Sequence, residues 1–133
     1  IALASSGQFE KAIADFSRVI KEDPTNEKLY ISRGYTYLQV NKPSDALLDF
    51  NKALEINPNE GNTFLNRCQA YYMLKELEKA KSDLQTAIRL GATVNPEFKK
   101  IIEAKCSSIT KNYTLFFIFR KYWYSFYSYL LNT

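Results

Sequence analysis

Apolar residues recur at steps of three and four along most of the chain, a spacing that places side chains on one face of an α-helix. The run Ala46, Leu47, Phe50, Ala53 and Leu54 is a clear example. The pattern predicts an all-α protein with two pairs of helices and one further amphipathic helix. The predicted helices cover residues 27–40, 43–56, 61–74, 77–90 and 95–108.

The same residue types return every 34 positions, and in each unit they appear in the same order. A period of this length is typical of arrays built from helix pairs. The matching sets are Ala12, Ala46 and Ala80; Phe16, Phe50 and Leu84; Val19, Ala53 and Ala87; Tyr30 and Phe64; Gly34 and Cys68; Tyr37 and Tyr71; and Pro24 and Pro58, with Ala92 in the third place.

The repeated residue types suit close packing of paired helices. Small side chains such as Gly34, Cys68 and Ala46 let two helices approach, so we expect Cys68 in the core. Pro24 and Pro58 follow the predicted second helices and disfavour helix at the residue before them.

The repeated positions resemble those of the tetratricopeptide repeat family. The resemblance is carried by "YISRGYTYLQVNKPSDALLDFNKALEINP" at 30–58, "FLNRCQAYYMLKELEKAKSDLQTAIRL" at 64–90 and the partial copy "SGQFEKAIADFSRVIKEDP" at 6–24. It covers about residues 1–108 and implies a right-handed superhelical solenoid of antiparallel helix pairs. The implied domains are a partial repeat at 1–26, full repeats at 27–60 and 61–94, a capping helix at 95–108 and an atypical tail at 109–133.

The two ends of the array are predicted to differ. The first repeat keeps only about Ile1–Ser5 of its first helix, so its second helix would show an apolar face to water. Because each repeat is stabilised mainly by its neighbours, we expect further repeats upstream and interpret the chain as a C-terminal fragment of an array. The helix over 95–108 has one apolar and one charged face, which is typical of a solvated cap.

The resemblance implies a concave groove, lined by the first helices, that holds an extended peptide or a partner helix. The three- and four-residue spacing independently places each set of candidates on one helix face. Amides suit such a groove because they pair with both N–H and C=O of an extended backbone. The expected groove residues are Lys28, Ile31, Ser32, Tyr35 and Gln39 in the second repeat, Asn62, Leu65, Asn66, Gln69 and Met73 in the third, and Lys99, Lys100 and Glu103 in the cap.

A narrower alternative is a co-chaperone. Some members of the family grip the C-terminal carboxylates of heat-shock chaperones with a set of Lys, Arg and Asn. Asn66 and Lys100 match two positions of that clamp, whereas Ile31, Tyr35 and Pro96 replace the polar residues expected at three others. The match is therefore partial.

Several candidates have a plainer interpretation. Arg33 and Arg67 could bind a ligand in the groove, yet Arg at this position more often supports packing. Asn66 could be a solvated polar residue on a helix face. Tyr35 and Tyr72 could pack against neighbouring repeats.

The sequence carries no signal for catalysis. It contains no His, which excludes catalytic triads and His-metal sites, and its four glycines form neither a P-loop nor a dinucleotide fingerprint. Cys68 and Cys106 match no metal or redox spacing and fit a reducing compartment. We expect no enzyme activity, catalytic residue, metal or cofactor, and a cytoplasmic location.

The charge and the aromatic residues gather at the C-terminal end. All 14 acidic residues precede position 104, where 14 of the 18 basic residues balance them. The net charge of +4 therefore comes from Lys105, Lys111, Arg120 and Lys121. It gives no support for nucleic-acid binding by the predicted repeats that precede these residues. Ten of the aromatic residues lie between Tyr113 and Tyr129 in the tail.

Three interpretations of the tail stay open. Aromatic and basic residues suit a membrane interface, although Arg120 and Lys121 interrupt the apolar run and argue against a spanning helix. The tail could instead fold back onto the solenoid, or be an artefact of translated non-coding DNA. We predict an adaptor or scaffold that binds a protein or peptide in its groove, with a membrane-associated assembly factor as the alternative that is not favoured. The sequence does not predict the oligomeric state.

Overall fold

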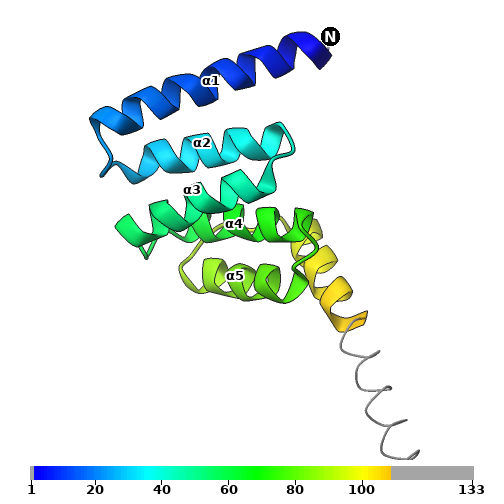
Figure 1. Ribbon diagram of the computed structural model, residues 1–133. Helices are drawn as coiled ribbons and strands as arrows, with labels where there is room; N and C mark the ends of the chain where they lie inside the picture. Colours follow the sequence, from blue (N-terminus) through cyan, green and yellow to red (C-terminus); the bar gives the residue numbers. More distant parts are fainter. Residues whose placement is uncertain (1, 109–133) are drawn as a thin grey trace, which may run out of the picture.

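The computed structural model describes residues 2–108, with side chains from Gly7 onward. In this part six helices follow one another and no strand is found. The first five helices alternate in direction and stack into one layer after another (Figure 1), which confirms the all-α solenoid. The elements are α1 (Ala2–Glu22), α2 (Glu27–Gln39), α3 (Pro43–Ile56), α4 (Gly61–Met73), α5 (Leu77–Arg89) and a final helix over 96–108.

The helix boundaries follow local signals. Asn26 caps α2 by accepting a hydrogen bond from the Lys28 backbone N–H at 3.2 Å, and Pro43 occupies the first turn of α3. Gly91 follows α5 with a φ of 82°, a conformation that suits glycine after a helix. From α2 onward, each predicted boundary agrees with the structure to within one residue.

The first helix departs from the prediction. We expected a short helix ending near Ser5, followed by a turn, but α1 continues unbroken from Ala2 to Glu22. Gly7 lies 34 residues before Asn41, which has a φ of 57° in the turn after α2. A Cβ at Gly7 would meet no atom within 4 Å. Because no segment among the described residues packs against Gly7, no tertiary contact within them favours the turn over continued helical hydrogen bonding.

The core consists of three small clusters between successive layers, as expected when each repeat packs only on its neighbours. Small residues allow the close approach that the sequence predicts: a Cβ added at Gly34 would lie 2.7 Å from Cε1 of Phe50. The clusters are Ile20, Tyr30 and Ala53; Leu38, Ala46, Phe50 and Ala70; and Cys68, Ala80, Leu84 and Ile102.

Both cysteines belong to the core, which confirms the placement of Cys68. Burial raises the pKa of the Cys68 thiol to about 12. Burial also raises the pKa of Cys106, whose Sγ donates a hydrogen bond to the carbonyl of Leu77 at 3.1 Å. Since the thiolate is the reactive form, the raised pKa of each thiol lowers its reactivity at neutral pH.

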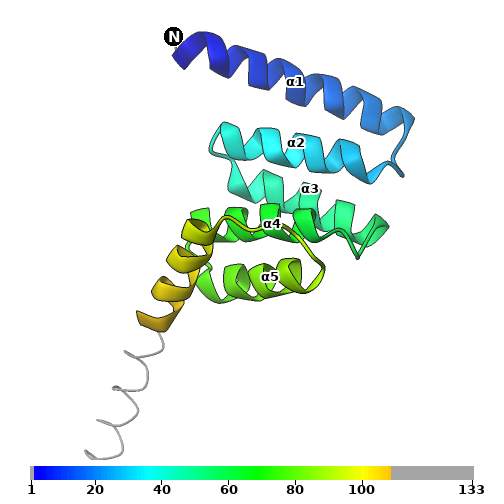
Figure 2. The same ribbon diagram turned by 180° about the vertical axis from the view of Figure 1, so that it is seen from behind.

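The final helix lies at the opposite end of the stack from α1 and runs obliquely to α4 and α5 (Figures 1 and 2). Within residues 2–108, no helix is both long enough and apolar enough to cross a membrane. The predicted tail, 109–133, lies outside the described residues, so its three interpretations stay predictions.

Candidate functional site

An open depression lies between α4 and the start of the final helix. Its volume is about 270 Å³. Leu65 and Asn66 contribute from α4, and Gln69 lies one turn further along the same helix. Asn95, the residue before the final helix, and Phe98, in its first turn, contribute the rest of the lining. Three of the predicted groove residues are therefore brought together.

The wall formed by Phe98 is held in place by aromatic packing. Its ring meets Tyr72 edge to face, with the ring centroids 6.0 Å apart and an interplanar angle of 82°. Leu65 and Phe98 both pack against the cluster around Cys68 and Leu84. The apolar part of the depression is thus an extension of the core.

The polar part of the lining consists of three side-chain carboxamides, which differ in the hydrogen bonds that they have left to make. The Oδ1 of Asn95 accepts from the backbone N–H groups of Glu97 at 2.8 Å and Phe98 at 3.3 Å, which caps the final helix. Its NH₂ group is left to donate. Among the described residues, the amides of Asn66 and Gln69 have no hydrogen-bond partner, so each can donate and accept.

None of the five lining residues is charged. The site therefore offers hydrogen bonds and apolar contact, which suit a neutral polypeptide backbone with an apolar side chain. Among residues 2–108 no cluster of three or more His, Cys, Asp or Glu is placed to hold a metal ion.

The other predicted groove residues are more scattered. Lys28, Gln39 and Asn62 are exposed, and so is half of the Tyr35 side chain. Ser32 is half-buried, and its carbonyl accepts the hydroxyl of Thr36 at 2.8 Å. Ile31 packs against the cluster of Ile20, Tyr30 and Ala53. The cap residues Lys99, Lys100 and Glu103 are exposed and line neither this depression nor the one beside Met73.

Met73 lines a second depression of about 340 Å³, at the turn between α4 and α5. The other lining residues are Tyr72, Lys75, Leu77 and Lys105. The Lys105 ammonium lies 5.3 Å from the centroid of the Tyr72 ring. Met73 therefore lies in a different depression from Asn66 and Gln69, so the groove residues predicted on α4 are divided between two depressions.

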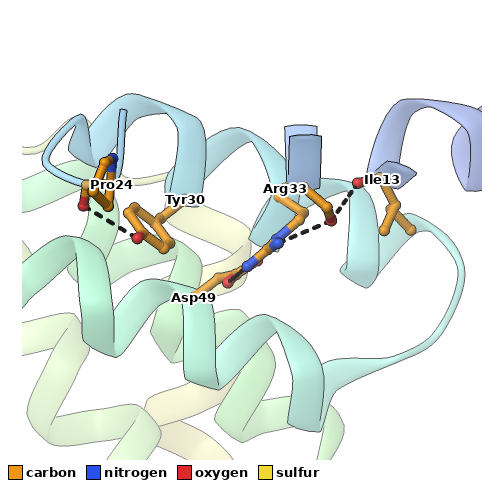
Figure 3. Close-up of polar contacts among 6 residues, drawn as sticks. Ile13, Pro24, Tyr30, Arg33 and Asp49 are labelled. Carbon is orange, nitrogen blue, oxygen red and sulfur yellow. Dashed lines mark hydrogen bonds and ion pairs between the residues drawn. The ribbon is translucent and has the colours of Figure 1, made fainter. Parts of the chain in front are cut away.

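Arg33 and Arg67 face inward and hold the helices of each repeat together. Nε and one terminal nitrogen of Arg33 donate to the two carboxylate oxygens of Asp49 at 2.8 and 2.7 Å, as Figure 3 shows. Arg67 makes the same pair of hydrogen bonds to Asp83 at 2.7 and 2.8 Å. The hydrogen bond to the carboxylate is the main cause that raises the pKa of each arginine. The packing interpretation of these two arginines is supported.

Each arginine also reaches the preceding repeat. The remaining nitrogen of Arg33 donates to Oγ of Ser17 on α1 at 2.9 Å, and that of Arg67 donates to Oδ1 of Asn51 on α3 at 2.8 Å. Our sequence reasoning missed the aspartate partners. The signal was present, because an Asp follows each Arg by 16 residues in both repeats.

The sequence reasoning also missed Asn95 as a site residue. An Asn before Pro96 and Glu97 is a recognisable helix cap. Its position beside Gln69, however, depends on how the final helix packs on α4. Phe98, in the first turn of that helix, is half-buried.

Two family models match the chain. One, described as tetratricopeptide repeat, covers residues 27–60, and the other, described as TPR repeat, covers residues 2–41. No curated protein sequence matches.

Several solved structures share the fold. The second TPR of Spaghetti (RPAP3) bound to HSP90 peptide SRMEEVD is 29% identical, covers 67% of this chain and 82% of its own, and has a TM-score of 0.61. The second TPR domain of human RPAP3, in complex with HSP70 peptide SGPTIEEVD, is 27% identical, covers 77% and 87%, and has a TM-score of 0.67. The Sgt2 TPR domain from Aspergillus fumigatus, at 15% identity, covers 83% and 76% with a TM-score of 0.73 and shows the fold alone. Residues 2–60 thus match models of the tetratricopeptide repeat family, and the 34-residue period and stacked helix pairs of residues 2–108 form a tetratricopeptide-repeat solenoid.

Proposed function

We propose that this chain is a protein–protein interaction module, an adaptor or scaffold, that binds an extended peptide of a partner protein at the depression between α4 and the final helix. The proposal rests on one observation: the carboxamides of Asn66, Gln69 and Asn95 line the same depression as the apolar side chains of Leu65 and Phe98. The absence of His from the sequence is consistent with a role in binding without catalysis.

The expected binding mode follows from the lining. Asn66 and Gln69 pair with backbone N–H and C=O groups of the peptide, and Asn95 donates to a backbone carbonyl. A net hydrogen bond between neutral groups contributes about 1 kcal/mol. Burial of one apolar side chain against Leu65 and Phe98 contributes about 2 kcal/mol. Neither term dominates, so the ligand needs both an extended backbone and an apolar residue.

The structural relatives support a peptide ligand in general terms. Two of them, at 29% and 27% identity, are TPR domains with chaperone peptides. For this chain, a site specific for a terminal carboxylate is the second candidate function. Asn66 and Lys100 favour it, but Ile31, Tyr35 and Pro96 occupy the other clamp positions. We therefore favour a neutral peptide segment.

A displayed library of random heptapeptides, selected on the full chain, tests the proposal. We expect enrichment of sequences with an apolar residue flanked by residues that permit an extended backbone. The double variant Asn66→Ala with Gln69→Ala should bind the selected peptides with an affinity lower by about tenfold or more, because two hydrogen bonds of about 1 kcal/mol each are lost.

Gln85→Ala is the matched control, because it removes an exposed amide from α5, away from the depression. The proposed site is refuted if the selection enriches no peptide. It is also refuted if Gln85→Ala weakens binding of the selected peptides as much as the double variant does.

The second candidate is tested with the peptide SRMEEVD as the free acid and as the C-terminal amide. We expect similar weak binding of both. If the free acid binds at least about tenfold more tightly, and Lys100→Ala abolishes the difference, a carboxylate clamp replaces the neutral-peptide proposal.

A further inference from the structure

The depression lined by Asn66 (the first depression) and the depression lined by Met73 (the second depression) follow each other along α4. Asn66, Gln69 and Met73 recur at steps of three and four, which places them on one face of the helix. On the final helix, Phe98 lines the first depression and Lys105 the second. These two residues are about two turns apart and share a helix face as well. The two depressions therefore lie between the same two helices, in the same order along both.

Tyr72 forms the boundary between the two depressions. Its ring meets the Phe98 ring of the first depression edge to face, with the centroids 6.0 Å apart. The same ring lines the second depression and lies 5.3 Å from the Lys105 ammonium. A peptide that leaves the first depression toward the C-terminal end of α4 thus reaches Tyr72 and then the second depression.

The two depressions differ in charge. The second has an apolar lining of Tyr72, Met73 and Leu77, to which Lys75 and Lys105 add two positive charges, and no acidic residue lines it. Neither lysine forms an ion pair within residues 7–108. An ammonium group has three donors and no acceptor. The second depression therefore complements an anionic group next to apolar surface, which the uncharged first depression does not.

Lys75 is held at the edge of the second depression by the turn between α4 and α5. Its backbone N–H donates to the carbonyl of Tyr72 at 3.0 Å, and its φ is 62°. One repeat earlier Asn41 has a φ of 57°, and Asn adopts this conformation more readily than Lys. Glu76, the next residue, forms an ion pair with Lys79 and so leaves the charge of Lys75 available.

The C-terminal segment of the chain lacks the charge that this depression requires. The sequence has no Asp or Glu after Glu103, so residues 109–133 bring no acidic side chain to the two lysines. The occupant with complementary charge is a partner peptide that carries an Asp or Glu side chain.

We propose that the peptide bound in the first depression continues past Tyr72 and places an acidic side chain between Lys75 and Lys105. The site extends the proposed function and rests on it. Asn66 and Tyr72 are six residues apart, about 9 Å along the helix axis. An extended peptide spans this distance with about three residues. The ligand is therefore an extended segment with an apolar residue and, about three residues away, an acid.

Met73 provides a reporter within the second depression. It is the only methionine of the sequence, so ¹³C labelling of the methionine methyl group gives an NMR signal from this depression. Spectra of Met73→Leu identify the signal. The probes, titrated into the full chain, are acetylated and amidated heptapeptides with Leu at the centre, Glu at the first or the last position and Thr elsewhere. In the matched peptides Gln replaces Glu.

We expect all four peptides to bind, and one of the Glu peptides to bind about fivefold more tightly than its Gln counterpart, as two exposed ion pairs allow. Only this peptide should shift the Met73 methyl signal markedly, and the position of its Glu reports the chain direction. The double variant Lys75→Asn with Lys105→Gln should lose the preference for Glu while its affinity for the Gln peptides is unchanged. Asn at position 75 suits the positive φ, so the turn is retained.

Lys42→Gln is the matched control, because it removes an exposed lysine from the turn one repeat earlier. It should leave the preference for Glu unchanged. The proposal is overturned if the Gln peptides bind and neither Glu peptide binds more tightly, an outcome that leaves the first depression intact. It is also overturned if Lys100→Gln, and not the double variant, removes the preference. If no peptide binds at millimolar concentration, the proposed function fails and this site fails with it.

Discussion

The guanidinium of Arg67 grips the carboxylate of Asp83 with two hydrogen bonds of 2.7 and 2.8 Å, and Arg33 and Asp49 repeat this arrangement one unit earlier. Asp49 and Asp83 are 6% and 7% exposed. The third nitrogen of each arginine extends the pair to the preceding repeat. One polar network therefore joins the two helices of a repeat to each other and to the repeat before.

We predict that Asp83→Ala is strongly destabilising, because it leaves the guanidinium of Arg67 without its partner in a mostly buried position. The free energy of unfolding should fall by about 3 kcal/mol, measured by urea denaturation. Asp45→Ala, in the exposed first turn of α3, is the control and should change the free energy by about 0.5 kcal/mol or less. The double variant Arg67→Met with Asp83→Leu should be more stable than Asp83→Ala, and the ion-pair argument fails if it is less stable.

Gly34→Ala should destabilise the fold although alanine is the better helix former. The added Cβ would lie 2.7 Å from Phe50, so the ring has to move within a packed core. We expect a loss of about 2 kcal/mol, which exceeds the gain of about 1 kcal/mol in helix propensity. Gly7→Ala meets no atom and should instead be stabilising by up to about 1 kcal/mol. Thermal unfolding, monitored by circular dichroism, should show a lower melting temperature for Gly34→Ala and a higher one for Gly7→Ala. A higher melting temperature for Gly34→Ala would contradict the packing described.

Thr63→Val should stabilise the chain. The Thr63 hydroxyl is buried and has no hydrogen-bond partner among the described residues. Valine has the same branched shape and removes the unsatisfied group, so we expect a gain of about 1 kcal/mol. Thr36→Val is the matched control: Thr36 donates to the Ser32 carbonyl at 2.8 Å, and its replacement should give no gain. Equal shifts of the melting temperature in the two variants would exclude the hydroxyl as the cause.

Alkaline pH should weaken the fold through Cys68. The pKa of this thiol is about 12 in the folded chain and 9.0 in the reference state, so between these values the folded state holds a proton that the unfolded state releases. The stabilising contribution is complete below pH 9 and is lost as pH rises toward 12. We expect Cys68→Ala, corrected for the lost side-chain packing, to flatten the decline of stability over this window.

Thiol labelling gives an independent measure of the same burial. At pH 8 the native chain should react with a disulfide reagent at Cys68 far more slowly than the chain in urea, because little thiolate forms and none is accessible. Rapid native labelling of Cys68 would mean that α4 and α5 separate readily.

Much of the architecture could be predicted because it is encoded locally. The 34-residue period, the three- and four-residue spacing of apolar positions, and Pro or Asn at the helix boundaries determined the helices from α2 onward to within one residue. The core position of Cys68 followed from its alignment with Gly34. These features depend on side chains a few residues apart, whose relation a helix makes regular.

The tertiary structure decided the features that depend on neighbours distant in sequence. Gly7 lies within a continuous helix and no segment among residues 7–108 packs against it, whereas Asn41 at the same repeat position forms a turn. Asn95 joins Asn66 and Gln69 only because the final helix packs across α4. Periodicity alone determined which face of each helix is apolar. Which segment covers that face, and which polar groups meet at its edge, depends on packing between elements.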